Sequence, residues 1–290
     1  MATACTNGLD TGFVDLGYAK VAVLGVVQGI TELLPISSTA HMKIVPSILG
    51  WRDPGTAFSA AMQAAALAAV ISYFWSDVRA LVVGSTRAVA RRDFADRHFR
   101  MAMYIALATA PLVIGGLLIS KTLNACDTPL RSLEVIGVAS LTMALLMGIA
   151  ETYCRHTRQY DEFTLKDAMI VGVAQVGALI PGVSRSGSTL TAALFRDFKR
   201  EDAAKFSFLL GLPAIAGAGL KEFYILYKAG IGAYAWSVLG LGLVVASLSA
   251  FVAIWGLLRI LERFSSWPFV VYRGLMGVFL IYAGLTGWLR

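Results

Sequence analysis

Long apolar stretches alternate with short charged ones along this 290-residue chain, and two of the apolar stretches are interrupted at their middle. An uninterrupted run of about 20 apolar residues is long enough to cross a bilayer as a helix. Six runs are predicted to be such spans, at about residues 56–75, 101–120, 133–150, 206–227, 235–258 and 268–289. The pattern therefore predicts an all-α polytopic membrane protein.

Each interrupted stretch has a proline between two half-length apolar segments. The segments are 18–34 and 36–51 around Pro35, and 167–180 and a segment ending near 197 around Pro181-Gly182. Proline ends a helix because it has no amide hydrogen and clashes with the preceding turn. We therefore predict two re-entrant helical hairpins, whose breaks must be buried in protein or face a water-filled cavity.

The same order of elements occurs twice, at about residues 18–150 and 167–289. In each half, three predicted crossings follow one hairpin. A hairpin returns to the side from which it entered, whereas three crossings change the side. We therefore predict a single membrane domain over residues 1–290, made of two inverted-topology repeats whose breaks meet near the midplane.

Basic residues gather in two of the connecting segments. These residues are Arg79, Arg87, Arg91, Arg92, Arg97 and Arg100 in segment 76–100, and Lys199, Arg200 and Lys205 in segment 198–205. The positive-inside rule places both segments in the cytoplasm. Loops 121–132 and 228–234 have fewer basic residues, so we expect them, both termini and the entrance of the first hairpin on the outer face.

Composition agrees with a membrane protein, since 57% of the residues are apolar, 15% are charged and the mean hydropathy is +0.70. The net charge of +7 comes from residues at the ends of spans, so nucleic acid is not an expected partner. Cys5, Cys126 and Cys154 lack the spacing of a metal site or a disulfide framework. The first 17 residues have no basic start or cleavage signal, and we expect them to be retained.

Polar residues at the first break indicate a site. Gln28 and Glu32 are four residues apart, so they share one face of a helix. A carboxylate and an amide oxygen suit Mg²⁺ or Ca²⁺, ions that also bind substrate phosphates. The alternative is that Glu32 makes internal hydrogen bonds that hold the break together.

The segment after Pro35 is rich in hydroxyl groups and contains Ser37, Ser38, Thr39 and His41. If a helix starts near Ile36, its free amides and positive dipole end attract an anion. His41 follows Ser37 by four residues and Ser38 by three, so its ring could reach either hydroxyl. This spacing permits a serine nucleophile with a histidine base, or a histidine acting alone. The alternative reading makes the hydroxyls helix caps and His41 a buried, hydrogen-bonded histidine.

The second break adds a cation, Arg185. Its planar guanidinium can bind two phosphate oxygens at once. A structural ion pair between Arg185 and Glu32 is the alternative. Further residues expected to bind substrate are Ser37, Thr39, Ser184, Ser186, Gly187, Thr189 and Gln63. For Gln63, a hydrogen bond between helices is an equally good reading.

Several motifs of the chain, in order, resemble one family. They are Gln28–Glu32, Pro35–His41, Pro181–Ser186, Phe206–Leu210 with Pro213, and Pro268–Arg273. Together they resemble the undecaprenyl-diphosphate phosphatases, also called bacitracin-resistance proteins. Ala40 stands where that family usually has glycine, and Ala64-Ala65 stand where Leu-Gly is commoner.

The resemblance implies an enzyme that hydrolyses undecaprenyl diphosphate to the monophosphate and inorganic phosphate, which recycles the lipid carrier of cell-wall synthesis. It implies metal binding by Gln28 and Glu32, attack or assistance by Ser38 and His41, and diphosphate binding by Arg185. We therefore expect a multi-pass protein of the bacterial inner membrane whose site opens to the periplasmic face. The expected partners are the polyprenyl diphosphate and membrane lipids, and a homodimer is considered as the assembly.

Two other functions are compatible with parts of the pattern. Inverted repeats with broken helices also occur in transporters, so an inverted-repeat transporter or lipid flippase is an alternative. A phosphatase of the phosphatidic-acid type would need a second histidine downstream of Ser184-Arg185, which the chain lacks. For the chemistry itself, attack by Ser38, by His41 or by water all stay open.

Overall fold

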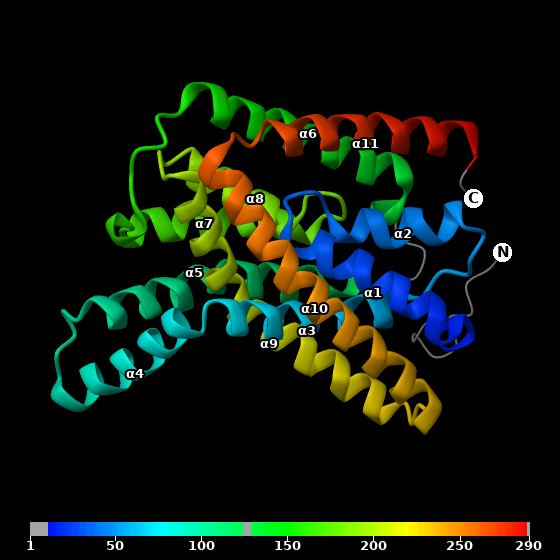
Figure 1. The fold of residues 1–290 in the computed structure, drawn as a ribbon, viewed down its shortest axis with the longest axis horizontal. Coiled ribbons are helices and arrows are strands. Elements are labelled where there is room, and N and C mark those ends of the chain that lie inside the picture. The colour runs from blue at the N-terminus through cyan, green and yellow to red at the C-terminus, as the bar shows by residue number, and fades with distance from the viewer. Residues whose placement is uncertain (1–10, 124–128, 289–290) are drawn as a thin grey trace.

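The computed structural model describes residues 11–123 and 129–288, and their regular structure is helical (Figure 1). Cys5, Cys126 and part of the predicted loop 121–132 lie outside these residues. The α-helices are α1 Gly17–Leu33, α2 Ser38–Ile48, α3 Thr56–Tyr73, α4 Trp75–Arg91, α5 Arg97–Leu123, α6 Leu133–Tyr153, α7 Leu165–Val176, α8 Arg185–Leu194, α9 Arg200–Lys228, α10 Ala233–Arg263 and α11 Trp267–Thr286. Single 3₁₀ turns are η1 Gly12–Leu16, η2 Pro129–Arg131, η3 Tyr160–Glu162 and η4 Gly177–Leu179.

Within the described residues, six helices are long and apolar enough to cross a membrane. Five of them, α5, α6, α9, α10 and α11, coincide with predicted spans. The sixth is the continuous segment Gly12–Leu33, whereas the sequence pattern predicts residues 18–34 as only one half of a hairpin. The predicted span at 56–75 corresponds to α3, which ends at Tyr73, where the chain turns by 83° into α4. The protein is nevertheless a multi-pass helical membrane protein.

The segment predicted as the loop 76–100 contains the helix α4, which corrects that prediction. Its arginines alternate with apolar residues such as Val82 and Val89, both exposed. A high density of charge favours a loop only when the apolar residues between the charges show no helical period. The apolar residues of α4 do recur with a helical period. The helix forms a hairpin with α5 at the left-hand end of the molecule (Figure 1).

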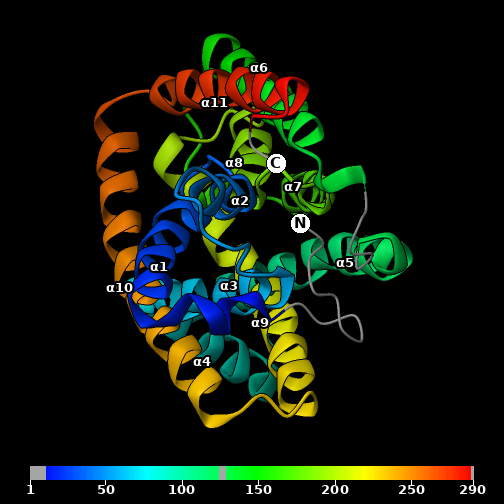
Figure 2. The same cartoon turned by 90° about the vertical axis from the view of Figure 1, so that its right-hand side faces the viewer.

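The broken helices occupy the middle of the molecule. Seen along the long axis, α1, α2, α7 and α8 are enclosed by α6 and α11 above, α10 on the left, α5 on the right, and α3 and α9 below (Figure 2). The helix α1 packs along α10, α5 along α7, and α6 along α11. The two breaks are therefore buried inside the protein, as non-helical backbone at membrane depth requires.

The hairpins enter from opposite ends of the long axis. The helix α1 runs inward from the right-hand end of Figure 1 and α2 returns to it, whereas α7 starts towards the left-hand end. Two glycines bring their first arms against neighbouring backbones. A Cβ on Gly29 would lie 2.3 Å from the Ala246 carbonyl oxygen of α10, and one on Gly172 would lie 2.2 Å from that of Ala108 in α5. These contacts hold the first half-helix of each hairpin directly against its neighbouring helix.

Candidate active site

Glu32 lies at the last turn of α1, where the helix ends because Leu34 is extended before Pro35. Its carboxylate is buried and accepts two hydrogen bonds at Oε2. Gln28 Nε2 donates one at 2.9 Å, and Ser38 Oγ donates the other at 2.7 Å. Gln28 and Glu32 therefore lie together on one helix face, as predicted, and Glu32 makes the internal hydrogen bonds of the alternative interpretation, which reach Ser38 across the break.

Arg185 reaches the same carboxylate from the second break. Its Nη2 lies 3.4 Å from Glu32 Oε1, so the predicted ion pair exists but is long. Its buried Nη1 has no hydrogen-bond partner in the described part of the chain. The guanidinium is held against Gly211 of α9, where a Cβ would lie 1.8 Å from Nη1. Arg185 therefore keeps donors for a further anion.

The residues before α2 and α8 share an unusual backbone conformation. Ser37 has φ 73° and Ser184 has φ 70°, in the left-handed region that only glycine adopts without cost. This turn directs the N-terminus of each second half-helix into the break. The Ser184 hydroxyl accepts a hydrogen bond from the Gly187 amide, 3.2 Å away, whereas the Ser37 hydroxyl has no partner among the described residues. Two helix N-termini thus favour negative charge near Glu32 and Arg185.

A cavity of about 610 Å³ lies between the breaks and the helices α5 and α9. Six of the predicted residues line it: Glu32, Ser38, Thr39, Gln63, Ser184 and Arg185. Apart from Lys221 of α9, mainly apolar and small residues form the rest of its wall, chiefly Leu112, Val113, Gly116 and Leu117 of α5, and Pro213, Ala214, Gly217 and Ala218 of α9. The cavity is therefore polar at the breaks and apolar towards α5 and α9.

Other predicted residues lie behind this surface. Ser186 Oγ donates to the carbonyl oxygens of Glu32 and Leu34, at 3.3 and 3.1 Å, and so joins the two breaks. Thr189 is fully buried and donates to the Arg185 carbonyl. Gly187 packs under an arginine of α11, and Ser37 is buried. The structure brings these residues to the site as supports and not as part of the cavity lining.

The structure does not place the ring of His41 at Ser37 Oγ or Ser38 Oγ, which corrects the expected contact. Nδ1 lies 2.8 Å from the Ser37 carbonyl oxygen, and Nε2 lies 2.5 Å from Tyr272 Oη of α11. A carbonyl can only accept, so Nδ1 carries the hydrogen and Nε2 of the neutral ring accepts from the tyrosine. Helical geometry explains this, because the carbonyl four residues earlier lies directly below the ring. His41 is thus held away from the cavity.

Arg273 is one site residue to which the sequence analysis assigned no role. It lies on α11 and is fully buried. Nη1 donates to the Pro35 carbonyl at 2.9 Å, and Nη2 donates to those of Gly182 and Val183 at 2.9 and 3.0 Å. These carbonyls have no helical partner, so one side chain satisfies the backbone of both breaks. An arginine within a predicted span was a signal for such a role.

Binding of Mg²⁺ or Ca²⁺ by Glu32 and Gln28 stays a prediction, and in this structure Gln28 presents its Nε2 donor to Glu32. Glu32 supplies a carboxylate and Gln28 an amide, but no group of three or more acidic, histidine or cysteine side chains surrounds them in residues 11–123 and 129–288. Mg²⁺ commonly binds through one or two carboxylates, waters and substrate phosphates. A structural metal site with all ligands from the protein is not formed here.

Comparison with known proteins agrees with the sequence motifs. The family model described as bacitracin resistance protein BacA matches residues 21–279. The chain belongs to the BacA family. It is 67% identical to "Undecaprenyl-diphosphatase 2" of Mesorhizobium japonicum over 263 residues, which are 91% of this chain and all of that protein. It is also 46% identical over 289 residues to an undecaprenyl-diphosphatase of Trichormus variabilis, and 49% identical over 272 residues to one of Synechococcus elongatus. Those alignments cover 99% and 93% of this chain, and 90% and 94% of the relatives.

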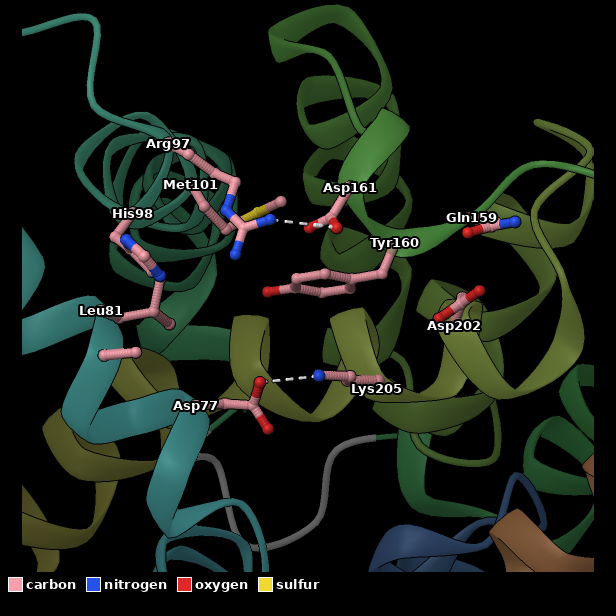
Figure 3. A pocket seen from close by; sticks show the side chains of 11 residues that line it. Asp77, Leu81, Arg97, His98, Met101, Gln159, Tyr160, Asp161, Asp202 and Lys205 are labelled. Atoms are coloured by element: carbon pink, nitrogen blue, oxygen red, sulfur yellow. Dashed lines mark hydrogen bonds and ion pairs between the residues drawn. The ribbon is translucent and has the colours of Figure 1, made fainter.

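This BacA family chain has a second hollow, of about 330 Å³, lined by α4, η3 and the first turns of α5 and α9 (Figure 3). Asp77 and Lys205 form an ion pair of 2.7 Å, Arg97 and Asp161 one of 3.3 Å, and Tyr160 lies between the two pairs. Burial, together with the negative charge of Asp77, raises the pKa of the Tyr160 phenol. The charged side chains that line the hollow largely pair with each other. The hollow therefore links the α4–α5 hairpin to α9, and its lining shares no residue with the cavity at the breaks.

Proposed function

We propose that this chain is an undecaprenyl-diphosphatase, which hydrolyses undecaprenyl diphosphate to the monophosphate and inorganic phosphate in the cavity between the two breaks. The observation that carries the proposal is the convergence of Glu32, Ser38 and Arg185 on one cavity, where Nη1 of the arginine has no hydrogen-bond partner among the residues that the structure describes. The curated relatives described above support it, because each has the name of this enzyme. Hydrolysis of this lipid recycles the carrier of cell-wall synthesis.

The geometry supports attack by Ser38 on the terminal phosphorus. Its hydroxyl already donates to Glu32, so the proton passes to that carboxylate as the new phosphorus–oxygen bond forms. The bond from phosphorus to the bridging oxygen breaks, and its electron pair stays on the lipid monophosphate. Water then displaces Ser38, which regains its proton from Glu32, and the inorganic phosphate keeps both hydrogens of the water.

Charge on the transferred phosphoryl group is the main catalytic demand of this reaction. Arg185 meets it with a planar pair of donors, and the N-terminal amides of α2 and α8 add positive potential. A Mg²⁺ or Ca²⁺ ion held by Glu32 and Gln28 would supply further neutralisation at the phosphate oxygens. Because the N-termini of α2 and α8 point into the breaks, they favour binding of the terminal phosphate there. The prenyl chain then extends towards α5 and α9.

Trapping the intermediate distinguishes the nucleophiles. With substrate labelled in the terminal phosphate, we expect a rapid quench to capture a label on the protein that survives acid and is lost in base, because it is a phosphoserine. Ser38→Ala should abolish the adduct, whereas His41→Gln should still form it. An adduct that is stable in base and labile in acid would instead assign the attack to His41, and absence of any adduct would favour direct attack by water.

We further propose that the fold consists of two inverted repeats with the site open to the periplasmic face of the inner membrane. In support, the contact of α1 with α10 has a counterpart in that of α7 with α5, and Gly25, Gln28 and Ser37 have counterparts 147 residues later in Gly172, Gln175 and Ser184. The arginine-rich α4 marks the cytoplasmic end under the positive-inside rule. Assembly as a homodimer stays a prediction.

Phosphate release tests the proposed activity. We expect purified protein with Mg²⁺ to release one inorganic phosphate for each undecaprenyl monophosphate formed. Arg185→Lys should lower kcat/KM at least about tenfold, because an ammonium keeps the charge but not the two-pronged geometry. The matched control is Arg259→Met on the exposed side of α10, which should keep wild-type activity. Movement of lipid across vesicles without phosphate release would favour the flippase.

A further inference from the structure

Lys221 of α9 lines the same cavity as Glu32, Ser38 and Arg185, and no motif of the sequence pointed to it. It is the third charged residue of that lining, and the other two pair with each other. Within the described residues, Lys221 makes no ion pair or hydrogen bond. Its neighbour Glu222 does not line the cavity, because adjacent residues of a helix point in different directions. The charge of Glu222 interacts with that of Lys221, but the Lys221 ammonium has no hydrogen-bond partner among the described residues, so its donors can bind a ligand in the cavity.

The position of Lys221 along α9 sets its depth relative to Arg185. The Arg185 guanidinium packs on Gly211, ten residues before Lys221, which corresponds to about 15 Å along the helix axis. Helical side chains point back towards the N-terminus, so an extended lysine shortens this separation to roughly 9 Å. One hydrogen bond of about 2.9 Å from each cation accounts for more than half of this separation. The distance between two oxygens of one diphosphate can account for the rest.

Small residues keep the path between these two cations open. Ala214, Gly217 and Ala218 lie on the cavity face of α9 between Gly211 and Lys221. A Cβ on Gly217 would meet no atom within 4 Å, so the space beside it is empty. A diphosphate bound at Arg185 can therefore extend along α9 towards Lys221 without obstruction.

We propose that Lys221 binds the phosphate that stays on the lipid, which is the leaving group of hydrolysis. This inference rests on the proposed function, which places the terminal phosphate at Ser38 and Arg185. When the bridging bond breaks, its electron pair adds negative charge to the lipid phosphate, and the ammonium of Lys221 stabilises that charge by hydrogen bonds. The same contact holds the lipid monophosphate after the inorganic phosphate has formed.

Product inhibition separates this role from membrane anchoring. Steady-state hydrolysis is measured for the wild type, Lys221→Gln and Lys221→Arg, with undecaprenyl monophosphate or inorganic phosphate added. For Lys221→Gln we expect kcat/KM to fall about tenfold and the inhibition constant of the lipid monophosphate to rise about tenfold. The inhibition constant of inorganic phosphate should not change, and Lys221→Arg should restore most of the activity.

Lys228→Gln is the matched control, because Lys228 has the same charge, lies on the same helix and is outside the cavity lining. It should behave as the wild type. Unchanged inhibition by the lipid monophosphate in Lys221→Gln, or an equal loss in Lys228→Gln, would overturn the assignment. If the wild type released no phosphate, the proposed function would fail instead. A thermal shift with undecaprenyl monophosphate alone would then still decide whether Lys221 binds a lipid phosphate.

Discussion

Replacing Glu32 by glutamine is expected to lower kcat/KM for undecaprenyl diphosphate by about 10³-fold or more. The variant keeps the size of the side chain but removes the negative charge. Ser38 then loses the acceptor that takes its proton, Arg185 loses its counter-ion, and a bound cation loses its carboxylate ligand. Each of these groups acts on the transferred phosphoryl, where losses of 10²–10³-fold per group are usual. Initial rates of phosphate release, measured with protein of wild-type melting temperature, check this.

The dependence on metal makes this test sharper. If Glu32 holds the cation, Glu32→Gln should need more Mg²⁺ for half-maximal rate, and chelation should abolish the wild-type activity. Glu262→Gln is the matched control, since Glu262 is exposed near the end of α10 and should leave the rate unchanged. A Glu32→Gln enzyme within tenfold of the wild type would show that another group takes the proton.

Replacing Arg273 by methionine is expected to damage both stability and activity. Three backbone carbonyls at the two breaks lose their donor, and each buried acceptor without a partner costs about 1–3 kcal/mol. We expect a loss of about 3–5 kcal/mol, which lowers the melting temperature by about 10 °C in a protein of this size. Because displacements near 1 Å at a reacting centre cost about 10²-fold, kcat should fall at least that far in the fraction that stays folded.

Thermal unfolding in detergent and the rate at low temperature separate the two effects. Arg263→Met, an exposed arginine at the end of α10, should change neither. Arg273→Lys should recover part of the stability, because an ammonium can still donate to some of the carbonyls. If Arg273→Met melted as the wild type does, water would have to satisfy the breaks in its place.

Sequence reasoning recovered the features that depend on local chemistry. Pro35 and the Pro181-Gly182 pair identified both breaks, and the charge on Glu32 and Arg185 at the ends of apolar runs identified the two sides of the site. Five spans followed from length and hydropathy alone. These inferences succeed because a proline, or a charge within an apolar run, has few structural explanations.

Other features depended on neighbours that are distant in sequence. The partner of His41 is Tyr272, 231 residues later, and helical spacing could show only that Ser38 was within reach. Arg273 was visible as a charge in a span, but its three acceptors lie on two other elements. The helix α4 was not predicted, because the high density of arginines in residues 76–100 indicated a loop. Neither Lys221 nor the sharp bend after Tyr73 had a local signal strong enough to single it out.

The apolar side of the active-site cavity has a kinetic consequence. Val113 and Leu117 of the candidate span α5 belong to its lining and are both exposed, so we expect the cavity to open between helices towards the lipid. A polyprenyl tail can thus remain among acyl chains while only its headgroup reaches the breaks. The rate should then follow the mole fraction of the substrate in the membrane and not its bulk molarity. Diluting the substrate with other lipids in the bilayer should slow turnover, whereas diluting the vesicles in buffer should not.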